Sequence, residues 1–234
     1  MNFLAHLLLS GSDLDIQVGG LLGDFVKGPL QGNYPEKVEQ GIRLHRHIDT
    51  LTARLPDMTQ LYTLFESPWR RYAGIVVDVA FDHLLAQRWQ HYHTLPLTVF
   101  CANFYRHLAI HRQWLPERAQ QFSDRAPQIR WLESYADPDI MITVLDRVGD
   151  RFKRPVPLGE CWRYVTTNRD CFDHAFSYAI QELAISSERF LTEISTTEAL
   201  IKGQPTASNH AISNRLLSGS CGQAPAVRLL RSNL

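Results

Sequence analysis

The sequence is poor in cysteine and contains no long apolar run. Its four cysteines among 234 residues, Cys101, Cys161, Cys171 and Cys221, are irregularly spaced and form no Cys-x-x-Cys pair. This argues against a disulfide framework or a zinc–thiolate site and fits a reducing cytoplasm. No apolar stretch approaches the roughly 18 residues of a membrane-spanning helix, and the apolar N-terminal stretch lacks the basic residues of a signal peptide. We therefore expect a cytoplasmic protein with no membrane partner.

An excess of charge of either sign is also lacking, as are the common nucleotide motifs. The 24 Lys and Arg residues balance 24 Asp and Glu residues, so no overall field attracts nucleic acid or an anionic membrane. The sequence contains no GxGxxG, GxxxxGK[ST] or GxSxG motif. Nothing in it therefore indicates a dinucleotide-binding protein, a P-loop NTPase or a serine hydrolase. Aromatic residues at helical spacing argue against a stacking platform for single-stranded nucleic acid.

Alternation of apolar and polar residues, the sign of a β-strand, is missing throughout. The sequence predicts an all-α fold with one helical domain over residues 1–194. The glycine pair at 19–20 indicates close backbone approach between two elements. Residues 195–234 contain none of the 24 aromatic residues, and we expect them to form a flexible, mildly basic tail. The predicted helices cover residues 3–10, 15–27, 35–54, 58–65, 68–89, 96–115, 117–124, 128–135, 138–148 and 159–193.

The stretch from Ile75 to Trp89 is apolar on more than one face and should be largely buried. Asp78, Asp82 and His83 nevertheless lie within it. Asp78 and Asp82 share a helix face at i, i+4 spacing, and two close buried carboxylates repel each other and lose hydration. A divalent metal compensates this charge better than the nearby arginines do, since a histidine accompanies the carboxylates.

Three other apolar segments each carry an acid or an imidazole. His45 and Asp49 share a helix face at i, i+4 spacing, whereas His47 points to another side. Asp24 stands alone among apolar residues, and so does His6. One buried histidine is usually only hydrogen-bonded, but several such groups together favour a carboxylate-rich metal centre. Oxygen-rich ligation with one or two imidazoles suits Mn²⁺ best, with Mg²⁺ or Fe²⁺ as alternatives.

Two further groups of polar residues have a plainer interpretation. His107 and His111 are spaced i, i+4, but their charged and polar neighbours predict a solvated face and not a metal site. The cysteine, aspartate and histidine within residues 171–174 lack a fourth ligand at zinc spacing. Among basic residues, Arg70 and Arg71 are the best candidates for binding phosphate. Arg46 and Lys27 are weaker candidates.

Four stretches in order resemble one known family. MNFLAHL at the start, LLGDFVKG at 21–28, GIRLHRHID at 41–49 and RRYAGIVVDVAFDHLLAQRW at 70–89 resemble the acyl carrier protein phosphodiesterases. That family removes 4′-phosphopantetheine from holo-acyl carrier protein and is regarded as a divergent relative of the all-α HD-domain phosphohydrolases. The chain departs from relatives at Thr52-Ala53, where they usually have a Thr-Asp pair, and at His47.

The resemblance implies a metal-dependent phosphodiesterase with holo-acyl carrier protein as its partner. It implies catalytic roles for Asp24, His45 and Asp82. The metal ligands that it implies are His6, Asp24, His45, Asp49, Asp78, Asp82 and His83. Two alternatives stay open: a phosphohydrolase of nucleotides or another small phosphoester, and a helical carrier-protein binding module without chemistry. The sequence predicts no oligomeric state.

Overall fold

The computed structural model describes residues 2–201, and within this range it contains helices and no strand. The prediction of an all-α fold is confirmed. No helix in the described range is long and apolar enough to cross a lipid bilayer. The α-helices are α1 (Phe3–Leu9), α2 (Leu14–Leu22), α3 (Glu36–Thr52), α4 (Pro56–Thr63), α5 (Ala73–Gln87), α6 (Leu97–Ile110), α7 (Glu117–Arg125), α8 (Trp131–Ser134), α9 (Met141–Gly149), α10 (Trp162–Thr167) and α11 (Arg169–Ile201). The 3₁₀ helices are η1 (Trp69–Tyr72), η2 (Trp89–His91), η3 (Arg112–Trp114), η4 (Pro138–Ile140) and η5 (Leu158–Cys161).

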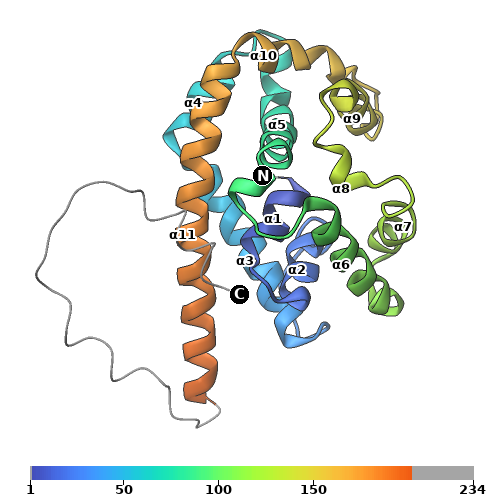
Figure 1. Cartoon of the computed structure of the whole chain (residues 1–234), viewed down its shortest axis with the longest axis vertical. Coiled ribbons are helices and arrows are strands. Elements are labelled where there is room, and N and C mark those ends of the chain that lie inside the picture. The colour runs from blue at the N-terminus through green and yellow to red at the C-terminus, as the bar shows by residue number, and fades with distance from the viewer. Residues whose placement is uncertain (1, 202–234) are drawn as a thin grey trace, which may run out of the picture.

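Helix α5 lies at the centre of the packing. In Figure 1, α11 runs along one side of the molecule and α6, α7, α8 and α9 lie on the other, with α1 and α5 between them. Helix α5 contacts α1, α4, α9, α10 and α11, and most of its side chains are buried. This confirms that the stretch from Ile75 to Trp89 belongs to the core, as its apolar residues on several faces predict.

Helices α2 and α3 cross at two glycines. A Cβ atom on Gly19 would collide with the Val38 carbonyl oxygen, and one on Gly41 would collide with the Ile16 carbonyl oxygen. Only residues without a side chain permit so close an approach. The close approach expected at residues 19–20 is therefore present, and it brings the middle of α3 against the end of α2.

Several predicted helices begin or end elsewhere, and the one expected over residues 96–115 ends at Ile110, with η3 after it. The helix expected over residues 15–27 ends at Leu22, after which the Asp24 and Phe25 backbone N–H groups bond the Leu21 and Leu22 carbonyl oxygens three residues back. The central helix begins at Ala73 and not at Pro68. Arg70 donates hydrogen bonds to the Phe65 and Thr63 carbonyl oxygens and ties η1 back to the end of α4. Residues 23–35 therefore form a loop beside α3, and Asp24 lies in it.

The later helices are more interrupted than the sequence predicts. The helix expected over residues 128–135 is reduced to α8, because Arg130 has a left-handed backbone with φ of 49°. The helix expected over residues 159–193 is broken at Asn168, whose backbone leaves the helical region with φ of −114° and ψ of 36°, while its side-chain amide donates to the Tyr164 carbonyl oxygen at 2.8 Å. Helix α11 continues past Ser195 to Ile201. The rest of the expected tail, residues 202–234, lies outside the described residues.

Candidate active site

Helix α3 carries the first two residues of the site. His45 and Asp49 lie one turn apart on one face, and His45 Nε2 is 3.2 Å from Asp49 Oδ2. The His45 side chain is 3% exposed, whereas that of Asp49 is 50% exposed, so the pair leads from the core to the surface. His47 points elsewhere, as its position on the helix predicts, and its Nε2 bonds Ser186 Oγ of α11 at 2.7 Å.

Helix α1 brings a second imidazole to the same carboxylate. The His6 ring stacks on the His45 ring, with 3.8 Å between centroids. Its Nε2 lies 3.2 Å from Asp49 Oδ1. Asp49 therefore presents one oxygen to each imidazole. We call His6, His45 and Asp49 the His–His–Asp cluster.

The end of α2 fixes the orientation of the His45 ring. His45 Nδ1 lies 2.7 Å from the Gly20 carbonyl oxygen. Because a carbonyl only accepts hydrogen bonds, Nδ1 carries a proton and Nε2 faces the carboxylates. A Cβ atom on Gly23 would overlap the ring of His45, so the absence of a side chain at Gly23 leaves the space that the imidazole fills.

Asp24 adds a second carboxylate at the edge of the cluster. It follows Gly23, and its Oδ1 lies 3.9 Å from His45 Nε2. Its side chain is 45% exposed. Asp24 therefore lies between the buried imidazole of His45 and the surface.

The cluster holds its members in defined protonation states. Burial lowers the pKa of His6 to about 3, against the opposing effect of Asp49, so this imidazole is neutral near pH 7. Burial acts to raise the pKa of Asp49, but hydrogen bonding to His45 and His6 lowers that pKa well below its ordinary value. Burial raises the pKa of Asp24, although His45 opposes the change.

These donor atoms fit a divalent metal ion. The ligand atoms of the His–His–Asp cluster all lie within 4.8 Å of one another. An imidazole nitrogen lone pair that faces carboxylate oxygens is repelled by them unless a proton or a cation lies between. Neutral imidazoles combined with carboxylates form a donor set that Mn²⁺, Fe²⁺ and Zn²⁺ accept.

Asp82 has different partners from those that the sequence predicts. Its carboxylate accepts hydrogen bonds from the Leu4 and Ala5 backbone N–H groups at 2.8 and 3.0 Å. These amides belong to the first turn of α1, where helical partners are missing, and Asn2 provides no side-chain cap. Burial raises the pKa of Asp82 to about 7, against the effect of the two amides. Asp82 thus anchors the helix that carries His6 and does not join the His–His–Asp cluster.

His83 and Asp78 also lie outside the cluster. His83 Nδ1 lies 2.7 Å from the Tyr135 carbonyl oxygen, and its ring meets Trp162 edge to face. Burial lowers the pKa of His83. Asp78 lines a cavity of about 240 Å³ together with Asp24. Of the three candidate residues on α5, Asp78 is therefore the one that lines this cavity together with Asp24.

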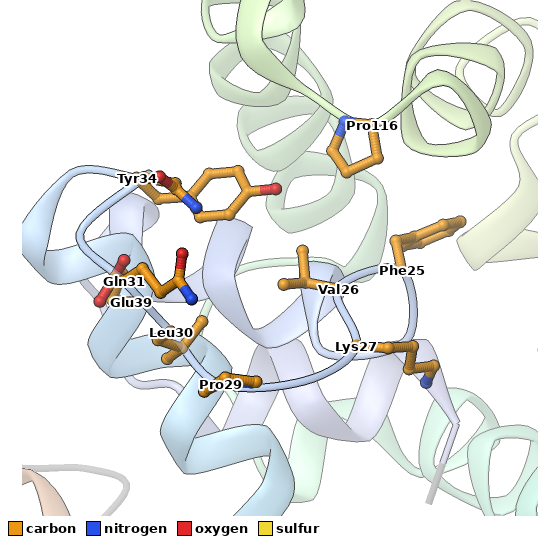
Figure 2. Close-up of a pocket in the computed structure, with 10 residues that line it drawn as sticks. Phe25, Val26, Lys27, Pro29, Leu30, Gln31, Tyr34, Glu39 and Pro116 are labelled. Atoms are coloured by element: carbon orange, nitrogen blue, oxygen red, sulfur yellow. The ribbon is translucent and has the colours of Figure 1, made fainter.

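The basic residues favoured from the sequence are partly engaged elsewhere. Arg70 bonds carbonyl oxygens of the α4 region, and Arg46 donates to the Val26 carbonyl oxygen at 3.1 Å. The guanidinium group of Arg71 lies 4.6 Å from the centre of the Tyr72 ring. Lys27 lines a separate cavity of about 290 Å³ formed by the loop after α2, and Figure 2 shows its side chain pointing away from Gln31 and Glu39.

A third cavity, of about 410 Å³, adjoins the one that contains Asp24 and Asp78. The two cavities share five lining residues, and no acidic residue lines the larger one. We call the larger cavity the arginine groove. Its arginines are Arg118, Arg125, Arg147 and Arg151; its apolar walls include Phe3, Phe25, Phe122, Ile129 and Trp131.

Local spacing of the arginines indicates this groove only weakly. Arg118 and Arg125 are spaced i, i+7 on α7, and Arg147 and Arg151 are spaced i, i+4 at and just beyond the end of α9. Each spacing is common on a solvated helix face. Only the fold shows that α7 and the end of α9 face the same cavity.

Imidazoles and carboxylates beside a groove lined with arginines are a combination typical of enzymes that act on phosphate esters. Residues 1–183 match the model of the acyl carrier protein phosphodiesterase family. The chain belongs to this family. The resemblance based on the four sequence stretches is thereby confirmed.

Curated relatives agree with the family assignment. Acyl carrier protein phosphodiesterases of Salmonella dublin, Salmonella agona and Salmonella paratyphi A are each 34% identical to this chain over 177 residues. The aligned part covers 75% of this chain and 92% of each relative. No solved structure gave a significant match.

Proposed function

We propose that this chain is a metal-dependent phosphodiesterase that removes the 4′-phosphopantetheine group from holo-acyl carrier protein. Membership of the acyl carrier protein phosphodiesterase family indicates this activity. One observation supports the location of the active site above all others. The two carboxylate oxygens of Asp49 each face an imidazole nitrogen at 3.2 Å, and Asp24 extends from this cluster into a cavity that adjoins the arginine groove.

We propose His6, His45, Asp49 and Asp24 as the residues that hold the metal. Mn²⁺ suits this mixture of imidazole and carboxylate donors best, with Fe²⁺ or Mg²⁺ as alternatives. When bound, such an ion lowers the pKa of a water molecule and neutralises charge on phosphoryl oxygens. Asp82 leaves the proposed ligand set because both of its carboxylate oxygens accept backbone N–H groups. His83 leaves it because its imidazole lies outside the His–His–Asp cluster.

The chain's own groups position the substrate around this centre. Arg118 and Arg151 line both cavities, so their guanidinium groups are placed to bind the phosphoryl oxygens close to Asp24. We assign to Asp24 the orientation of the attacking water and the acceptance of its proton at a carboxylate oxygen. Attack at phosphorus expels the serine oxygen of the carrier and releases 4′-phosphopantetheine and apo-acyl carrier protein.

The arginine groove also suits the protein partner. Acyl carrier proteins are acidic, and the rim arginines Arg125 and Arg147 provide the opposite charge. The aromatic walls accommodate the apolar parts of the pantetheine arm. We therefore propose that the arginine groove binds the acyl carrier protein. Arg71 and Lys27, which were also candidates from the sequence, are the alternative contacts. A cytoplasmic location belongs to the same proposal, in keeping with the free thiols of Cys101 and Cys161.

The test is hydrolysis of holo-acyl carrier protein by protein that has been stripped with a chelator. We expect mass spectrometry to show loss of the phosphopantetheine arm only after Mn²⁺ is restored. Asp49→Asn should lower kcat/KM by at least about 100-fold, because it removes a ligand shared with both imidazoles. Asp170→Asn, which changes an exposed acid at the start of α11, is the matched control and should be fully active.

The same assay separates the two alternatives. Faster hydrolysis of a nucleotide than of holo-carrier would favour a general phosphohydrolase. Tight binding of holo-carrier without loss of its arm, in the presence of Mn²⁺, Fe²⁺ or Mg²⁺, would overturn the enzymatic proposal in favour of a binding module.

A further inference from the structure

A second group of two histidines and one aspartate lies outside the proposed active site. His107 is in the last turn of α6, His111 follows the end of that helix, and Asp15 is in the first turn of α2. Asp15 Oδ1 lies 2.7 Å from His107 Nε2 and 3.1 Å from His111 Nε2. The two nitrogens are themselves 3.2 Å apart. We call these three residues the α2–α6 triad.

Two of the three mutual distances in the α2–α6 triad are close to those of a tetrahedral metal site, and the third is shorter. Zinc bonds of about 2.0 to 2.1 Å to nitrogen and oxygen place the ligand atoms of a tetrahedral site about 3.3 Å apart. The three separations here are 2.7, 3.1 and 3.2 Å. Both Nε2 atoms converge on one carboxylate oxygen. A single cation between them satisfies all three donor atoms at once.

The fold already brings these ligands together. The i, i+4 spacing places both imidazoles on one side of α6, and α2 packs against α6. The side chains of Asp15, His107 and His111 are 34, 24 and 19% exposed, so an ion can enter and a water molecule can complete the coordination. The charged and polar neighbours of the two histidines indicate a solvated face in the sequence, and Asp15, at 92 and 96 residues' distance, gives no local sign of a third ligand.

We propose that the α2–α6 triad binds Zn²⁺ with one water as the fourth ligand and thereby fastens α2 to α6. Two imidazoles and one carboxylate match the ligand number of open zinc sites. The site shares no residue with the His–His–Asp cluster and does not depend on the proposed phosphodiesterase activity. Because the other end of α2 holds the His45 ring, zinc at the triad stabilises the helix that supports the active site.

Zinc binding by the full chain tests this proposal. Asp49→Asn serves as the background, so that binding at the His–His–Asp cluster is weakened. After chelator treatment, equilibrium dialysis should show one zinc ion bound with a Kd in the micromolar range or tighter. Zinc should also raise the Tm, and Co²⁺ should give the visible absorption of a four-coordinate site.

His107→Gln with His111→Gln in this background should weaken zinc binding by at least about 100-fold and remove the zinc-dependent rise in Tm. His91→Gln, an exposed histidine outside the triad, is the matched control and should keep both. If the double variant does not fold, the single variant His111→Gln decides by the same measurements. The proposal is overturned if the background binds no zinc in the micromolar range, or if the triad variants bind zinc as tightly as the control.

Discussion

Gly23 is the residue on which the position of the His45 ring depends most directly. Its backbone φ of −52° is helical, so alanine is acceptable to the main chain, but the added Cβ would overlap the imidazole. We predict that Gly23→Ala displaces the ring by a fraction of its width and lowers kcat/KM by about 100-fold, since such displacements disturb the arrangement of reacting groups. The metal affinity should fall as well.

Gly74→Ala is the control for this substitution. Gly74 lies inside α5, and the nearest atom to an added Cβ would be the Tyr62 hydroxyl oxygen at 3.9 Å. This change should stabilise the protein by about 0.5 to 1 kcal/mol and leave activity unchanged. Steady-state kinetics and metal titration compare the two variants. Normal metal affinity in Gly23→Ala would contradict this prediction, because the His45 imidazole would then bind the metal from another position.

Single residues also show which parts of the site can be predicted from the sequence. Asp82 and His83 gave the same signal as His6 and Asp49, because a polar group in an apolar segment looks alike whether its role is structural or catalytic. The bonds that distinguish them join Asp82 to Leu4 and Ala5 over 78 and 77 residues, and His83 to Tyr135 over 52 residues. Such partners follow from the packing of helices and not from local spacing.

At the scale of elements, α1 depends on one carboxylate of α5. Asp82→Ala would leave the Leu4 and Ala5 backbone N–H groups buried without an acceptor. We predict a loss of about 2 to 5 kcal/mol in the free energy of unfolding. Activity should fall too, because His6 is on the same short helix. Urea unfolding at constant pH measures the effect, and Asp82→Asn, which keeps one acceptor, should lose less. Unchanged stability in Asp82→Ala would contradict the anchoring role.

The contact between α5 and the end of α8 should make stability depend on pH. Burial lowers the pKa of His83 from its ordinary 6.5, so the folded protein binds a proton there less readily than the unfolded chain does. Its contribution to stability is therefore complete above pH 6.5 and falls as the pH drops below that value.

His83→Asn tests this pH dependence. The asparagine amide keeps a donor near the Tyr135 carbonyl oxygen but does not titrate. We expect the Tm of the unmodified protein to fall more steeply than that of the variant between about pH 7.5 and 5. His6 is buried in both proteins, so the difference between the two curves isolates His83. Parallel curves would show that His83 does not titrate in this range.

Whole helices were predicted best where apolar residues cover several faces or one continuous face. This holds for α5 and for α3, which begins after Pro35 as expected. The break between α10 and α11 lies at the non-helical backbone of Asn168, and the shortening of α8 depends on the left-handed backbone of Arg130. Hydrophobic periodicity continues through both places, so it does not reveal either interruption.

At the scale of the whole molecule, the net charge does not reveal the basic surface of the arginine groove. Equal numbers of acidic and basic residues predict no long-range attraction for an acidic partner. The fold nevertheless gathers four arginines from α7 and the end of α9 around one groove without an acidic residue. A local field of this kind depends on which elements face each other, and composition does not contain that information.

We predict that Arg125→Gln and Arg147→Gln each raise the KM for holo-acyl carrier protein, and that the pair of substitutions flattens its dependence on salt. Rim charges mainly change the association rate, so kcat should change less than KM. Arg118→Gln and Arg151→Gln should lower kcat as well, because their guanidinium groups are placed at the phosphoryl oxygens and stabilise the charge of the transition state. Arg71→Gln, whose guanidinium group lies over Tyr72, is the comparison. A larger effect at Arg71 than at the groove would move recognition to η1.

The segment 202–234 offers a rival source of positive charge, since it contains Lys202, Arg215, Arg228 and Arg231 and no acidic residue. This segment lies outside the described residues, so its contribution to carrier binding has to be measured by kinetics. We predict that removing it leaves KM unchanged across a salt series, because the groove already supplies four arginines beside the cluster. Combining the truncation with Arg125→Gln sharpens the comparison. If the truncation alone raises KM strongly at low salt and the groove substitution adds nothing, the segment and not the groove captures the carrier.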